Sequence, residues 1–309
     1  MIFPYLSLYV LVFSFISFVL FILFPVPHGK FSWKLPLMID SDIAWALING
    51  PALIIIFGYF DNENGTWVSK LPSSAKGSLA MVFFIIHFIW RSIISVLWIR
   101  HIHSELPETR GCKKTSFLIV LVSWFYYPVI GMLIRHMAVN MTGELSAHDI
   151  IFLLGALIFL FLNAYVDIIL NYSRTTSPDV KTHPTIGIYL TKIGLKKHFK
   201  ILVHLGIECP NYFFEILEWG FFALFTLRFE SLWWFVSTIL ILLPRALWTS
   251  HWYSECMDDI EESLQNDLNE EKVDKQPVNE AVKPSRVAPK KIISAKKPLK
   301  KIKLNGFVF

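Results

Sequence analysis

Long apolar stretches, separated by short polar connections, run through most of the chain. Seven of them approach the roughly 20 apolar residues that a helix needs to cross a bilayer. They cover about 2–26, 43–60, 77–99, 116–135, 150–170, 211–227 and 231–248. The first stretch holds no charged residue and has no basic segment before it, so we expect a retained membrane helix rather than a signal peptide. The pattern predicts an all-α, polytopic membrane protein built as a seven-transmembrane-helix bundle.

The composition agrees with this fold class. The chain is 54% hydrophobic and only 17% charged, whereas a soluble domain carries about 25% charged residues. Its three cysteines form no CxxC pair, and no Cys, His and carboxylate set has the spacing of metal ligands. Walker A and GxGxxG elements are also absent from the sequence. We therefore expect free thiols, no metal site, no Rossmann domain and no nucleic-acid partner.

Basic residues predict how the helices are oriented. Among the loops between stretches, those after the first, third and fifth hold most of the Lys and Arg residues, at 30–34, 100–114 and 174–200. Because such loops stay on the cytoplasmic side, we expect a lumenal N-terminus and a cytoplasmic C-terminus. Two N-glycosylation sequons, at Asn64 and Asn140, fall in loops that this topology places in the lumen.

The composition changes near residue 253, which divides the chain into a membrane domain over 1–253 and a tail over 254–309. The tail is acidic between Asp258 and Glu271 and then rich in Lys and Pro, so we expect a mostly disordered, flexible basic C-terminal segment. It either binds anionic membrane lipids or acts as a solvated linker. Contacts with protein partners are also expected through this tail.

Polar residues interrupt the apolar stretches at helical spacing. His87 and Arg91 are four positions apart in the third stretch, and Asn163 and Asp167 have the same spacing in the fifth, with Arg174 continuing that face. Residues four apart share one helix face, and a polar face in a membrane usually points to the bundle interior or a wet cavity. We expect either a ligand cavity or buried structural pairs at these positions.

A further polar group stands at the head of the sixth stretch, in the sequence ECPNYFFEILEW. Pro210 favours a helix start with Asn211 as its cap, and it places Glu215 and Glu218 in the first two turns. Anionic side chains are stabilised there by the helix dipole, which is a sufficient structural explanation. The alternative is a cavity shared with the polar residues of the fifth stretch.

The motif CPNYFFEILEW, followed by PRA and then WY, resembles the C-terminal half of the steroid 5α-reductase family. Weaker similarities are PHGKFSW and IAWALINGP near the N-terminus. The resemblance covers about 27–253, and its family-like C-terminal region is about 150–253. It implies an integral membrane oxidoreductase that binds NADPH in a cavity open to the cytoplasm. Such enzymes reduce a carbon–carbon double bond conjugated to a ketone in a lipophilic substrate.

The resemblance also implies which residues surround the cofactor. By position, these cofactor-binding residues are Trp45, Arg91, Arg100, Asn163, Asp167, Arg174, Asn211, Glu215, Glu218 and Tyr253.

Two positions depart from the family pattern where its chemistry takes place. Asn49 stands where the family has a carboxylate, and Phe88 stands where many members have a tyrosine. The family's pair is expected to polarise the substrate carbonyl and to support proton delivery. An amide can donate a hydrogen bond but cannot act as an acid, and a phenyl ring can do neither. The identity of the catalytic residues is therefore left open.

Three kinds of function are consistent with cofactor residues that match the family and catalytic positions that differ from it. The first is NADPH-dependent reduction of a C=C bond conjugated to a carbonyl in a lipid or steroid-like substrate. The second is a catalytically inactive family member that serves as a structural subunit of a membrane complex. The third is a lipid- or nucleotide-binding sensor.

A trans-2-enoyl-CoA reductase is a related alternative, because such enzymes share the CPNY element but lack the EILEW continuation. The family resemblance predicts the endoplasmic reticulum as the location, with the mitochondrial inner membrane as the alternative.

Overall fold

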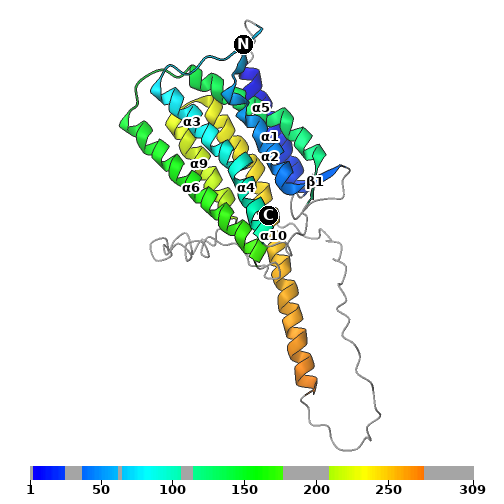
Figure 1. The fold of residues 1–309 in the computed structure, drawn as a ribbon. Coiled ribbons are helices and arrows are strands. Elements are labelled where there is room, and N and C mark those ends of the chain that lie inside the picture. The colour runs from blue at the N-terminus through cyan, green and yellow to red at the C-terminus, as the bar shows by residue number, and fades with distance from the viewer. Residues whose placement is uncertain (1–2, 25–36, 62–64, 106–113, 177–208, 275–309) are drawn as a thin grey trace, which may run out of the picture. The chain divides into compact units, whose positions relative to one another are not determined.

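The computed structural model describes residues 3–24, 37–61, 65–105, 114–176 and 209–274 (Figure 1). Contacts divide the chain into two units, Met1–Glu261 and Glu262–Phe309. The first, here called the helical unit, contains the elements discussed below. Of the second unit the structure describes only residues 262–274, which are helical. The basic part of the predicted tail, 275–309, lies outside the described residues.

Helices form most of the described chain. In order they are α1 (Phe3–Leu23), α2 (Ser41–Asn49), the 3₁₀ helix η2 (Gly50–Ile56), α3 (Ala75–Ile89), the π-helix η3 (Trp90–Ile94), α4 (Ser95–Glu105), α5 (Phe117–Val139), α6 (Ala147–Thr176), α9 (Pro210–Thr226) and α10 (Phe229–Asp274). The backbone of α10 therefore stays helical across the composition boundary at residue 253.

Four short strands occur outside the helices: β1 (Met38–Asp40), β2 (Tyr59–Asp61), β3 (Thr66–Val68) and β4 (Lys114–Ser116). β1 pairs antiparallel with β4, with Met38 opposite Ser116. β2 and β3 form a second antiparallel pair, with Tyr59 opposite Val68. Each strand pair joins two segments of the chain near the ends of helices.

Among the described residues, five helices are long and apolar enough to cross a membrane: Tyr5–Leu23, Ala75–His101, Phe117–Val139, Ala147–Asn171 and Phe229–Trp252. The prediction of a mostly helical membrane protein is thus confirmed at this level. The other two predicted spans are shorter helices. One is Ser41–Ile56, where Pro51 lacks an amide proton and the chain changes from α to 3₁₀ geometry. The other is α9, with 17 residues.

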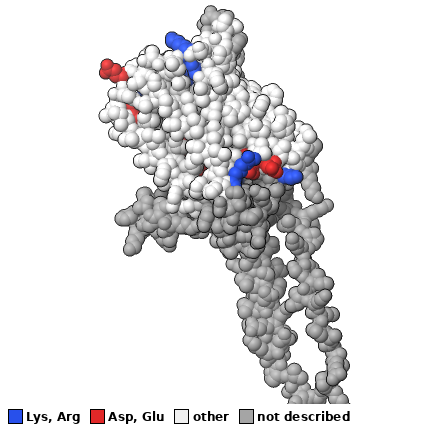
Figure 2. Space-filling view, viewed as in Figure 1, with Lys and Arg blue, Asp and Glu red and all other residues white. Residues whose placement is uncertain are grey.

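The connections between helices gather at two ends of the helical unit. At one end Arg135 donates to the carbonyls of Ser69 and Lys70, each at 2.9 Å, and Arg228 donates to the carbonyl of Asn140 at 3.1 Å. These contacts join the loops after the second, fourth and sixth predicted spans. The β1–β4 pair joins the loops after the first and third spans. On the face in Figure 2, charged side chains lie near the two ends and the broad band between them is uncharged.

The core of the unit is aromatic. Trp219 of α9 is fully buried, and its ring centroid lies 4.6 Å from that of His87, 5.3 Å from that of Trp234 and 5.9 Å from that of Phe83. Large rigid rings bury much apolar area for few rotatable bonds. Helices α3, α9 and α10 are therefore held together around one tryptophan.

Helix α9 begins one residue earlier than we expected. Pro210 is its first residue, the preceding Cys209 has a left-handed backbone (φ 53°), and no side chain caps the helix. The prediction that Asn211 caps this helix is wrong. Proline has no amide proton to satisfy and a fixed φ that suits the first helical position, so the helix starts at Pro210 itself.

Candidate functional site

Six polar side chains from three neighbouring helical segments meet inside the helical unit. This polar cluster consists of His87, Arg91, Asn163, Asp167, Glu215 and Glu218. The first two come from the α3–η3 segment, the next two from α6 and the last two from α9. All are buried except Asp167, which is partly exposed. Figure 1 shows α3, α6 and α9 running side by side, which brings these residues together.

Arg91 is the cation at the centre of the cluster. Its Nη1 lies 3.1 Å from Oδ2 of Asp167, and its Nη2 lies 3.1 Å from Oε2 of Glu215. The guanidinium also lies over the ring of Trp45 in α2, 4.8 Å from the centroid, which is a cation–π contact. Arg91 thus joins α2, α6 and α9 from a position inside the π-helix η3. Single π turns inside α-helices often occur at functional sites.

A second group in the cluster is centred on Glu218, which is fully buried. Its Oε1 lies 2.5 Å from Nδ1 of His87, and its Oε2 accepts a hydrogen bond from Nδ2 of Asn163 at 3.2 Å. A contact of that length between a ring nitrogen and a carboxyl oxygen holds a proton on one of the two atoms. Both oxygens of Glu218 are therefore used.

Several polar atoms of this region are buried and make no hydrogen bond within the described residues. They are Nε of Arg91, Oδ1 of Asn163 and Nε1 of Trp219, together with Oε2 of Glu215, whose pairing with Arg91 lacks hydrogen-bond geometry. Leaving such an atom unpaired costs about 1–3 kcal/mol. Donors and acceptors therefore both remain unpaired in the described part of this region.

The structure brings together six of the ten predicted cofactor residues: Trp45, Arg91, Asn163, Asp167, Glu215 and Glu218. Arg100 is half exposed and pairs instead with Asp42 at 3.4 Å. Asn211 lies in the first turn of α9. The side chains of Arg174 and Tyr253 lie outside the described residues, although their backbones belong to α6 and α10.

The two positions that depart from the family pattern are both buried. Nδ2 of Asn49 donates one of its two hydrogens to the carbonyl of Trp45, in its own helix, at 2.8 Å. Phe88 is packed against Trp219 and Tyr127, with ring centroids at 6.4 and 5.8 Å. Neither side chain can act as an acid.

Sequence reasoning missed two parts of this region. It did not predict that His87 would pair with Glu218, which depends on the rotation of two helices that are far apart in sequence. It also left out Arg245, whose guanidinium lies 5.5 Å from the ring centroid of Tyr212. The PRA motif was the available signal, because Arg245 is its arginine.

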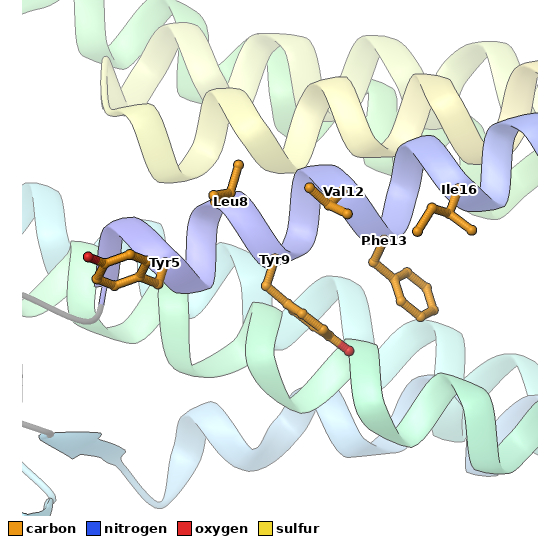
Figure 3. A pocket seen from close by; sticks show the side chains of 6 residues that line it. All are labelled: Tyr5, Leu8, Tyr9, Val12, Phe13 and Ile16. Atoms are coloured by element: carbon orange, nitrogen blue, oxygen red, sulfur yellow. The ribbon is translucent and has the colours of Figure 1, made fainter.

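A separate hollow of about 340 Å³ lies along α1, lined by Tyr5, Leu8, Tyr9, Val12, Phe13 and Ile16 (Figure 3). All six residues come from one helix and none belongs to the predicted site. Most of them are exposed apolar side chains, as is usual for a helix surface that faces lipid.

Comparison with known proteins finds a family similarity in the part of the chain that carries α5, α6 and α9. Residues 113–263 match the family model described as 3-oxo-5-alpha-steroid 4-dehydrogenase. This region, here called the reductase-family domain, is similar to the steroid 5-alpha-reductase family. This reductase-family domain holds the α6 and α9 residues of the polar cluster, whereas Trp45 and Arg91 precede it.

Three relatives extend the similarity beyond the reductase-family domain. Steroid 5-alpha-reductase DET2 of Solanum lycopersicum is 26% identical over 81% of this chain and 89% of its own length. Steroid 5-alpha-reductase DET2 of Gossypium hirsutum is 24% identical, covering 72% and 78% respectively. An uncharacterized protein of Schizosaccharomyces pombe is 27% identical, covering 74% and 84%.

Proposed function

We propose that this protein is an NADPH-dependent membrane reductase that saturates a C=C bond conjugated to a carbonyl in a lipophilic substrate. The observation that carries this proposal is the buried Arg91, held between Asp167 and Glu215 and stacked on Trp45. A buried polar group in a membrane helix is costly and usually serves a function. The family match and the relatives named as steroid 5-alpha-reductases agree with the reaction class.

The polar cluster fits the nicotinamide–ribose end of NADPH. A carboxamide both donates and accepts, and the unpaired atoms include the acceptor Oδ1 of Asn163 and the donors Nε of Arg91 and Nε1 of Trp219. The phosphates do not fit among three carboxyl groups, because like charges repel. Arg245 and Arg100 are the cations that would hold them. When bound there, NADPH supplies the hydride for the reaction.

The remaining side chains suit a substrate that arrives from the bilayer. Apolar side chains such as Phe125, Phe161 and Ile151 are 70%, 67% and 64% exposed on the helical unit, as expected where helices contact lipid acyl chains. We propose an endoplasmic reticulum membrane as its location, with a lumenal N-terminus. The gathering of alternate loops at the same end supports this up-and-down arrangement.

A structural subunit without catalysis is the second candidate, and one observation favours it. Asn49 is bonded to its own helix and Phe88 is packed among aromatic rings, so the positions that hold the family's donor pair carry no acid. This candidate predicts partners in fixed ratio and no cofactor.

The test is purification of the full chain in mild detergent, followed by mass spectrometry for bound NADP(H) and titration with NADPH by fluorescence. Arg91→Gln removes the cation of the cluster and should weaken NADPH binding by about tenfold to a hundredfold, the equivalent of a lost charged hydrogen bond. Arg228→Gln is the matched control, because Arg228 lies at another helix end and should leave binding unchanged.

Wild-type protein that binds no NADPH, and that purifies with stoichiometric partners, would overturn the reductase proposal in favour of the structural one. Equal NADPH affinity in the wild type and in Arg91→Gln would refute the assignment of the polar cluster as the cofactor site. The thermal midpoint of each variant, measured in the same detergent, separates loss of binding from loss of folding.

A further inference from the structure

The proposed reaction needs a hydrogen-bond donor at the substrate carbonyl. Addition of a hydride to the β-carbon of an enone places negative charge on the carbonyl oxygen. Removing one donor to such an oxygen typically costs about 10²–10³ in kcat. Phe88 has no polar atom, and Asn49 uses one of its two amide hydrogens on the carbonyl of Trp45.

Tyr127 of α5 carries a hydroxyl beside the second of these positions. Its ring centroid lies 5.8 Å from that of Phe88, with an interplanar angle of 74°. Phe88 in turn lies against His87 of the polar cluster, with ring centroids 5.0 Å apart. Within the described part of the chain its hydroxyl makes no hydrogen bond, and the residue is only partly buried.

Two other candidate donors of this region are engaged, whereas the buried Nε1–H groups of Trp219 and Trp234 are unpaired among the described residues. The hydroxyl of Tyr126 lies 3.1 Å from Oγ of Ser14, on the side of α5 that faces α1. Nδ1 of His87 is in contact with Glu218. Tyr127 is therefore the hydroxyl donor next to the cluster that is left for a substrate.

We propose that Tyr127 is a catalytic residue, whose hydroxyl donates to the substrate carbonyl in place of the tyrosine that Phe88 replaces. This inference rests on the proposed reductase function. The β-carbon gains a hydride from the reduced nicotinamide, the C=C electron pair shifts towards the carbonyl, and an enolate results. The Tyr127 O–H donates a hydrogen bond to the enolate oxygen and keeps its proton. The α-carbon then takes a proton from water, which leaves as hydroxide, as the carbonyl re-forms.

The experiment uses the full chain in detergent or nanodiscs, with NADPH and the enone 4-cholesten-3-one as the probe. Tyr127→Phe removes one oxygen atom and should lower kcat by about 10²–10³, while the Kd for NADPH stays unchanged. Tyr126→Phe is the matched control. It removes the neighbouring hydroxyl, which faces Ser14, and should leave kcat within a few fold.

A rescue variant separates chemistry from packing. Since the rings of Phe88 and Tyr127 touch, Phe88→Tyr in the Tyr127→Phe background returns a hydroxyl to nearly the same place. It should restore a measurable part of kcat without changing the thermal midpoint relative to the single variant.

The outcomes distinguish this inference from the function on which it rests. Wild-type protein that neither binds NADPH nor reduces the probe overturns the reductase function, and the role of Tyr127 with it. Wild-type turnover with equal kcat in Tyr127→Phe overturns the role of Tyr127 alone. A loss in Tyr127→Phe that Phe88→Tyr partly restores supports both.

Discussion

Glu218 links three helices through the two oxygens of one carboxyl group. It lies on α9, its Oε1 contacts His87 on α3, and its Oε2 accepts from Asn163 on α6. The residue is fully buried, so water cannot replace either partner. The contacts of Glu218 are therefore structural as well as part of the candidate cofactor site.

We expect Glu218→Ala to lower the free energy of unfolding by about 3–5 kcal/mol, because removing one member of a buried pair leaves the other uncompensated. The measurement is the thermal midpoint of the purified protein in detergent. Glu144→Ala is the control, since Glu144 is exposed. Equal midpoints for the two variants would contradict the structural role of Glu218.

At the residue scale, helical spacing predicted which polar residues share a face but not which ones pair. The four-residue intervals from His87 to Arg91 and from Asn163 to Asp167 were sufficient to place each pair on one helix face. The pairing of His87 with Glu218 depends on how α3 and α9 are rotated about their axes. Tyr127 carried no signal, because a tyrosine in an apolar stretch is common near membrane interfaces.

At the scale of elements, the packing of α5 against η2 fixes the position of Tyr127 relative to Asn49. η2 continues α2, which ends at Asn49, and α5 carries Tyr127. One turn after Tyr127, a Cβ added at Gly131 would lie 2.4 Å from the carbonyl oxygen of Ala52. Only glycine permits this close approach between backbones.

Gly131→Ala should force α5 away from η2 and cost about 1–3 kcal/mol of stability, as overpacking usually does. It should also lower reductase turnover, because Tyr127 moves with α5. Gly50→Ala provides the control, since a Cβ added there meets no atom within 4 Å. Thermal midpoints and turnover rates would be compared for both variants. A control that loses as much stability and turnover as Gly131→Ala would count against this explanation.

The apolar pattern predicted the positions of the elements better than their lengths. Five predicted spans correspond to helices of membrane-crossing length. The second was overestimated, because the change to 3₁₀ geometry at Gly50 and Pro51 leaves no trace in hydropathy. The π turn at Trp90–Ile94 was likewise invisible, since inserting one residue into a turn does not alter the apolar character of the stretch.

At the scale of the whole molecule, the helical unit has two distinct ends. One end holds the carbonyl of Asn140 and its partner Arg228, and the other holds the pair of Arg100 and Asp42. The distribution of basic residues predicts that the second end is cytoplasmic. Sidedness depends on the membrane, so the fold alone does not determine it.

Cysteine labelling tests this orientation. In a background with Ser at the three native cysteines, His101→Cys should react with a membrane-impermeant maleimide in intact microsomes. Thr142→Cys should react only after detergent opens the vesicles. Both positions are exposed in the structure. The reverse pattern would place the N-terminus in the cytoplasm.

The contact between His87 and Glu218 spans 131 positions of the chain, and this has a consequence for biosynthesis. The ribosome finishes the helix that carries His87 and Arg91 long before it makes α9. During that interval the two side chains lack the carboxylates of α9. Translocon measurements put the free-energy cost of inserting a charged group at mid-membrane at about 2.5–3.5 kcal/mol. A chain that ends before α9 keeps Arg91 paired with Asp167 alone and leaves His87 without Glu218, a feature by which quality control can distinguish it from a finished protein.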